Sequence, residues 1–171
     1  MSAHRLESTR LLLIPLESAD WIAFRPIATD AAVMRYITGG VPWTDEKIIE
    51  FVERQRRHYS ERGFCLWKMI LKADGRLAGF CGLQPLDDLP GVEIGWWLAQ
   101  DLWGRGLATE AAQMALADGF ERVGLERIVA VAIRENGASL RVMKKLGMKY
   151  ESDTVRRGFA VVLYAIEKKE S

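Results

Sequence analysis

The sequence predicts an α/β protein, a single domain over 1–171 with one mixed β-sheet and helices on both faces. Residues 91–110 carry an apolar, aromatic half, then a glycine-containing turn, then strong helix formers, the pattern of a strand–turn–helix unit. The nearly continuous apolar run at 127–133 is typical of a strand buried on both faces. A chain of 171 residues, 49% hydrophobic and 27% charged, suits one substantial core.

Hydrophobic patterning predicts the remaining elements in chain order. The predicted strands are 10–16, 64–72, 77–83, 91–100, 127–133, 150–154 and 159–166. The predicted helices are 19–27, 30–36, a long helix after 44 whose apolar stripe includes Gln55, one from 107 to about 124, and 136–146. Ser18 and Thr44 are the expected N-caps of the first and third helices, and Gly147 is expected to end the last one.

Charge and composition exclude several classes of protein. A net charge of +1 gives no electrostatic case for binding nucleic acid or a membrane surface. The N-terminus lacks the apolar core of a signal peptide and no run is long enough to span a membrane, so a cytoplasmic protein is expected. Cys65 and Cys81 lie in apolar runs and are expected to be buried free thiols. No cluster has metal-ligand spacing, so no metal is predicted.

The turn at 103–108 predicts a phosphate site. Gly104, Gly106 and the small Ala108 let a ligand approach the backbone closely, and the helix that follows presents unpaired N–H groups and the positive end of its dipole. Such a helix N-terminus suits a pyrophosphate. The dinucleotide fingerprint fails because Thr109 stands where its third glycine belongs, and no Walker tripeptide occurs.

This turn resembles motif A of the GNAT superfamily of N-acetyltransferases, Q/R-x-x-G-x-G/A. Trp103-Gly-Arg-Gly106-Leu-Ala108 matches it except at Trp103, a variant similar to the branch of ribosomal-protein alanine N-acetyltransferases. Asn136-Gly-Ala-Ser139 and Lys145-Leu-Gly-Met148 support the resemblance, which extends over 9–166. It implies a GNAT-like acyl-CoA N-acyltransferase fold, in which two neighbouring parallel strands splay apart and acetyl-CoA lies with its pantetheine in the gap.

The resemblance implies roles for individual residues. The backbone of the central strand would hydrogen-bond the pantetheine amides at Trp96, Trp97 and Leu98. The N–H groups of the turn would hold the pyrophosphate, at Gly104, Arg105, Gly106, Leu107, Ala108 and Thr109. Trp103 removes a side-chain contact of the motif but leaves this backbone cradle intact. The Arg105 side chain either pairs with a phosphate or is solvent-exposed.

Two residues of the next helix complete the implied cofactor site. Asn136 matches the family's cofactor-bonding asparagine, with an N-cap as its other role. Ser139 matches a position near the thioester sulfur or the pantetheine, with a helix-surface hydroxyl as its other role. The tyrosine with which many members protonate the leaving thiolate is replaced by Met143, so Ser139 or solvent would serve as the acid.

The implied reaction is direct transfer of the acetyl group to an amine. Glu93, a lone carboxylate in an apolar strand, is the candidate general base. The other interpretations of Glu93 are a solvent-facing carboxylate or one paired with an arginine. A backbone N–H of Trp97 or Leu98 would stabilise the oxyanion.

The acceptor is expected to be a primary amine, either a protein N-terminal α-amine or a small molecule. Its pocket is expected in the loops at 37–44, 84–90 and 153–158, with Trp43 placed to close over it. Two alternatives are a non-catalytic acyl-CoA-binding or sensing module and transfer of a longer acyl group, against which the bulky Trp96 and Trp97 argue. The resemblance is also compatible with a homodimer.

Overall fold

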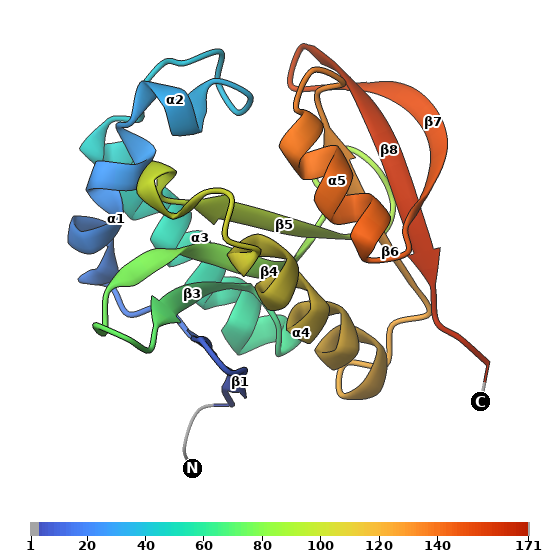
Figure 1. The fold of residues 1–171 in the computed structure, drawn as a ribbon, viewed down its shortest axis with the longest axis horizontal. Coiled ribbons are helices and arrows are strands. Elements are labelled where there is room, and N and C mark those ends of the chain that lie inside the picture. Colours follow the sequence, from blue (N-terminus) through green and yellow to red (C-terminus); the bar gives the residue numbers. More distant parts are fainter. Residues whose placement is uncertain (1–3, 171) are drawn as a thin grey trace.

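The computed structural model describes residues 4–170. Figure 1 shows one sheet and its surrounding helices. The strands are β1 (Leu6–Glu7), β2 (Leu11–Ile14), β3 (Leu66–Leu71), β4 (Leu77–Pro85), β5 (Val92–Leu98), β6 (Arg127–Ala132), β7 (Lys149–Arg156) and β8 (Phe159–Glu167). The helices are α1 (Asp20–Ala28), α2 (Ala31–Met34), α3 (Asp45–Arg62), α4 (Leu107–Glu121) and α5 (Gly137–Lys145), with a 3₁₀ turn over Gln100–Leu102.

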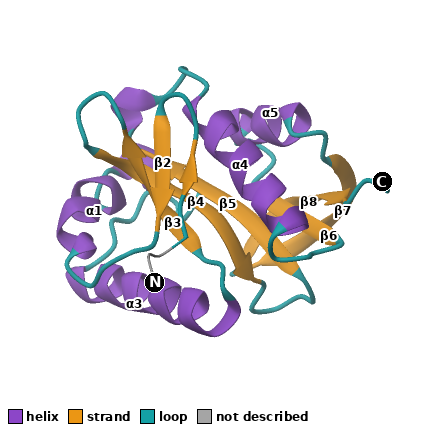
Figure 2. Ribbon diagram, turned by 90° about the horizontal axis from the view of Figure 1, so that it is seen from below, coloured by secondary structure: helices purple, strands orange, loops and turns teal. Residues whose placement is uncertain are grey.

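The sheet is mixed and lies between two layers of helices. Its strand order is β1-β2-β3-β4-β5-β6-β8-β7, and β5–β6 is its parallel pair. Figure 2 shows α1 and α3 on one face of the sheet and α4 and α5 on the other. The predicted fold class, a single mixed sheet covered on both faces, is therefore confirmed.

The sheet opens between β5 and β6. β4 and β5 stay in one unbroken antiparallel register from Gly79↔Leu98 to Pro85↔Val92. By contrast, β5 and β6 share one registered pair among the described residues, Glu93↔Val129. Beyond Glu93 the two strands diverge, which is the splay that the resemblance implied.

Local differences from the predicted elements have physical causes. Ser18 is not the cap of α1: the helix begins at Asp20, and the Ser18 hydroxyl accepts a hydrogen bond from Arg56 at 2.6 Å. Thr44 does cap α3, since its hydroxyl accepts from the N–H of Lys47 at 3.3 Å. β4 extends to Pro85, so the loop predicted at 84–90 begins two residues later than expected.

Among residues 4–170 no helix is long and apolar enough to cross a membrane.

Both cysteines are buried free thiols, as predicted. Cys65 is 1% exposed and Cys81 is fully buried. Burial raises the pKa of the Cys65 thiol to about 12 and raises the pKa of Cys81 as well. A thiol that stays protonated at neutral pH is a poor nucleophile, so these cysteines contribute to packing instead of chemistry.

Candidate active site

The turn before α4 is built as an anion site. Gly104 and Gly106 both have φ of 76°, a left-handed conformation that favours glycine, and Gly106 is the N-cap of α4 with no side-chain cap. The first helical hydrogen bond is from the N–H of Glu110 to the Gly106 carbonyl, at 3.1 Å. Within the described residues, the N–H groups from Gly104 to Thr109 donate no hydrogen bond. These free donors at the positive end of a helix suit a phosphate.

The register of β5 decides which backbone groups face the gap. The N–H of Ala99 donates to the Ala78 carbonyl of β4 at 2.9 Å. Backbone groups alternate between the two sides of a strand, so those of Trp97 also face β4, while those of Trp96 and Leu98 face β6. The structure therefore directs the backbone of Trp97 away from the gap, unlike the sequence-based expectation, and leaves Trp96 and Leu98 beside it.

Trp103 joins the end of β5 to the turn. Its indole N–H donates to the Leu98 carbonyl at 2.9 Å, and 47% of the residue is exposed. The tryptophan that departs from motif A thus fixes the turn against the strand. The N–H of Leu98 stays directed toward the gap.

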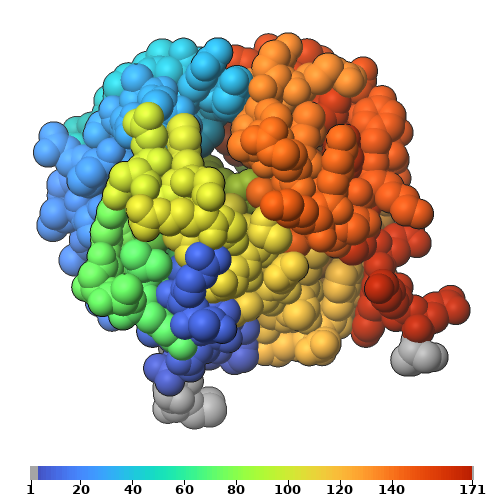
Figure 3. Space-filling model, viewed as in Figure 1, coloured from blue at the N-terminus to red at the C-terminus, as the bar shows by residue number. Residues whose placement is uncertain are grey.

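α5 lies across the gap from the turn. Asn136 is its N-cap, and its Oδ1 accepts from the N–H of Ser139 at 3.3 Å. The cap uses the amide oxygen, so the amide NH₂ is still available to donate. Ser139 is half-buried in the first turn of α5. Figure 3 shows the surface hollowed where the segments near residues 40, 100 and 140 meet, coloured cyan, yellow and orange.

Glu93 is buried and held by two donors. It is 7% exposed; its Oε1 accepts from Nε2 of Gln84 at 2.9 Å, and its Oε2 from Nη1 of Arg156 at 2.8 Å. Arg156 is 7% exposed and also donates to Asp88, at 3.0 Å. The arginine partner considered from the sequence is thus present. The guanidinium of Arg156 therefore forms a buried ion pair with the Glu93 carboxylate.

Gln55 extends this network to α3. It is fully buried; its Oε1 accepts from the N–H of Leu66 at 2.9 Å, and its Nε2 donates to Oε1 of Gln84 at 3.0 Å. The sequence reasoning missed Gln84 and Arg156 as partners of Glu93. The one available signal was a glutamine within an otherwise apolar helical stripe, because a buried amide requires polar partners.

Replacing Gln55 with leucine is expected to lower the free energy of unfolding by about 1–3 kcal/mol, because the N–H of Leu66 loses its acceptor in a buried site. Urea denaturation followed by tryptophan fluorescence measures the change. Gln113→Leu, on the exposed side of α4, is the matched control and is expected to stay within about 0.5 kcal/mol of the wild type. A wild-type midpoint for Gln55→Leu would contradict this role.

An aromatic wall stands on the same face of the sheet as Glu93. The ring centroids of Trp43 and Trp97 are 5.0 Å apart, and both rings lie 5.6 Å from Phe51. Side chains on a strand alternate between faces, so Trp97 and Glu93 share the α3 face with Gly95 between them. The loop that carries Trp43 is therefore packed onto β5.

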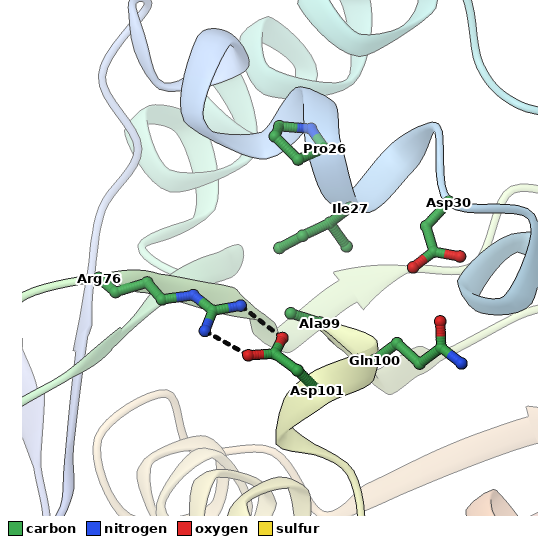
Figure 4. A pocket seen from close by; sticks show the side chains of 7 residues that line it. All are labelled: Pro26, Ile27, Asp30, Arg76, Ala99, Gln100 and Asp101. Carbon is green, nitrogen blue, oxygen red and sulfur yellow. Dashed lines mark hydrogen bonds and ion pairs between the residues drawn. The ribbon is translucent and has the colours of Figure 1, made fainter.

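A separate pocket of about 500 Å³ lies at the end of β5, near the C-terminal part of α1 (Figure 4). Arg76 donates two hydrogen bonds of 2.6 Å to Asp101 in its wall. The other lining residues are Pro26, Ile27, Asp30, Ala99 and Gln100. None of the predicted site residues lines it, so we distinguish this pocket from the candidate active site.

Comparison with known proteins identifies the family. The model of the acetyltransferase (GNAT) domain matches residues 10–149. The chain belongs to the GNAT acetyltransferase family. An uncharacterized N-acetyltransferase of Bacillus subtilis, YnaD, is 35% identical over 146 residues, 85% of this chain and 83% of YnaD. The spermidine N(1)-acetyltransferase of Escherichia coli is 28% identical over 165 residues, 92% of this chain and 80% of its own.

A solved GNAT structure has the same fold. RimL, a ribosomal L7/L12 alpha-N-protein acetyltransferase solved in complex with coenzyme A, gives a TM-score of 0.78 at 17% identity, with 96% of this chain and 98% of RimL covered. As a GNAT member, the protein is an acetyl-CoA-dependent acyltransferase. The free N–H groups before α4 and the open edge of β5 have the donors that a pyrophosphate and amide groups require, so the chain fits acetyl-CoA.

Proposed function

We propose that this enzyme transfers the acetyl group of acetyl-CoA directly to a primary amine, either a protein N-terminal α-amine or a small-molecule amine. The observation that carries the proposal is the run of free N–H groups from Gly104 to Thr109. This run follows β5 in the chain, and the edge of β5 that faces β6 is open. The spermidine acetyltransferase and RimL, whose acceptors are a polyamine and a protein, support an amine as acceptor without deciding its size.

In this proposal the cofactor is held mainly by the backbone. The N–H groups from Gly104 to Thr109 hold the pyrophosphate, and the exposed side chain of Arg105 adds charge beside it. The backbone groups of Trp96 and Leu98 pair with the pantetheine amides along the gap. From the other side, Asn136 donates through its amide NH₂, and Ser139 contacts the thioester end.

Acetyl-CoA supplies the thioester that the amine attacks. Glu93, whose Oε2 accepts from Nη1 of Arg156, accepts the proton of the acceptor ammonium directly or through water. The N–H of Leu98 or of Trp96 stabilises the oxyanion, because both face the gap. Met143, buried at 1% exposure, has no acidic proton, so Ser139 or solvent protonates the leaving thiolate.

The acceptor would enter on the α3 face of the sheet. The aromatic wall of Trp43 and Trp97 bounds that face on one side, and the network of Glu93 and Arg156 bounds it on the other. The acceptor pocket would be completed by the segment at 37–44, the loop after β4 and the turn between β7 and β8. Residues 84–85 and 153–156, predicted as loop, are strand, because β4 extends to Pro85 and β7 to Arg156.

Calorimetric titration with acetyl-CoA, followed by an acceptor screen, tests the function. We expect saturable binding and turnover with N-terminal peptides or with small amines such as spermidine. Binding without turnover across both acceptor classes would favour the non-catalytic acyl-CoA-binding module. Succinyl-CoA as a second donor tests the acyl group, and faster turnover with it would contradict acetyl transfer. Absence of any acetyl-CoA binding would overturn the proposal.

A further inference from the structure

Arg10, near the N-terminus, contacts the turn before α4. It lies directly before β2, and its Nη1 donates to the Arg105 carbonyl at 2.9 Å. Its Nη2 is 3.7 Å from the position that a Cβ on Gly106 would take. A residue 95 positions away in sequence therefore contacts the centre of the turn.

This contact sets the direction of one peptide group. The peptide unit is planar, and its C=O and N–H point in opposite directions. The carbonyl of Arg105 and the N–H of Gly106 belong to the same peptide. Because Arg10 holds the carbonyl on one side, the N–H of Gly106 is aimed to the other side, where a phosphate oxygen can accept from it.

Glu110 and Ser8 hold Arg10 in place. Glu110, in the first turn of α4, accepts from Nε of Arg10 at 3.0 Å through Oε1. Its Oε2 accepts from the Ser8 hydroxyl at 2.7 Å and from the backbone N–H of Arg10 at 3.2 Å. Partial burial raises the pKa of Glu110, but the hydrogen bonds from Ser8 and Arg10 outweigh it and leave that pKa below its usual value.

The charges in this cluster are nearly balanced. Without Arg10, a carboxylate in the first turn of α4 would oppose the anion that the helix N-terminus attracts. With Arg10 bound, the charge of Glu110 is compensated at 3.0 Å. Arg10 thus orients a donor and neutralises the carboxylate beside it.

We propose that Arg10 is a positioning residue for the cofactor pyrophosphate, acting through the Arg105 carbonyl and Glu110. The inference rests on the proposed function, since it assigns a residue to the same cofactor site. It predicts a defect confined to ligands that carry the pyrophosphate.

The test compares two acetyl donors in the Arg10→Gln variant. Acetyl-CoA carries the pyrophosphate, whereas S-acetylpantetheine lacks it. We expect the dissociation constant for coenzyme A and the KM for acetyl-CoA to rise about tenfold, with kcat unchanged. We expect kcat/KM for S-acetylpantetheine to equal that of the wild type. An equal loss with both donors would show a role in the whole fold and overturn the proposal, as would unchanged affinity for coenzyme A.

Two further variants sharpen the test. Arg10→Lys keeps the charge that compensates Glu110 but loses the planar fork that spans Glu110 and the Arg105 carbonyl, so it should recover only part of the affinity lost in Arg10→Gln. Full recovery with lysine would overturn positioning in favour of charge alone. Arg25→Gln breaks an exposed pair with Asp45, 2.8 Å long, and should bind like the wild type. If the wild-type protein binds no coenzyme A, the proposed function itself is contradicted. This outcome is distinct from failure of the Arg10 proposal, in which the wild type binds coenzyme A and Arg10→Gln binds it equally well.

Discussion

Gly106→Trp is expected to abolish measurable binding of acetyl-CoA, a loss of more than about a hundredfold in affinity. Gly106 is the N-cap of α4 at φ 76°, and a Cβ there lies 3.7 Å from Arg10. An indole in this position displaces Arg10 from the Arg105 carbonyl, so the N–H groups from Gly104 to Thr109 no longer hold the orientation in which several of them reach one phosphate together. Calorimetric titration with acetyl-CoA measures the loss.

The matched control is Gly75→Trp. Gly75 has φ of 72° in the β3–β4 turn, and a Cβ there would meet nothing within 4 Å. Both substitutions place a tryptophan in a left-handed conformation, at a cost of roughly 1–2 kcal/mol each, but only one touches the cradle. We expect Gly75→Trp to bind acetyl-CoA with wild-type affinity. Wild-type binding by Gly106→Trp would show that the cofactor phosphates lie elsewhere.

Glu93→Gln is expected to lower kcat about a hundredfold while the KM for acetyl-CoA stays near the wild-type value. The amide keeps the shape of the side chain but cannot accept the proton of the acceptor. KM is spared because Glu93 lies on the α3 face, away from the turn before α4. Steady-state kinetics with the best acceptor from the screen measures both constants.

A second substitution separates proton transfer from the ion-pair network. Asp88→Asn makes the same carboxylate-to-amide change at the other partner of Arg156, 3.0 Å away, and leaves Glu93 in place. Asp88 has a side chain 43% exposed, and we expect kcat to change less than about twofold. Equal losses of kcat in the two variants would show that Glu93 acts by holding Arg156 and the β7–β8 hairpin in place. An unchanged kcat in Glu93→Gln would exclude Glu93 as the general base.

Features set by local chemistry could be predicted from the sequence. The turn before α4 follows from two glycines and the helix formers after them, and the Thr44 cap follows from a hydroxyl placed before an acidic first turn. The splay of β5 and β6 came from the family resemblance, because no residue pattern signals where two parallel strands separate.

Features set by long-range pairing could not be predicted. The backbone of Trp97 faces β4 because of its register with that strand, and shifting a register by one residue exchanges the two sides. Arg156 donates to Glu93 although the two residues are 63 positions apart in sequence, and Arg56 donates to the hydroxyl of Ser18 across 38 positions. In each case the partner belongs to an element that only tertiary packing brings near.

The single registered pair between β5 and β6 has a thermodynamic consequence. Past Glu93 no further registered pair joins these strands among residues 4–170, so a molecule lying along Trp96 and Leu98 supplies contacts that the chain itself lacks. A ligand that binds only the folded state adds about 2.7 kcal/mol to the unfolding free energy at a hundredfold excess over its dissociation constant. In the proposed arrangement, the melting temperature of this enzyme therefore rises with the concentration of acetyl-CoA.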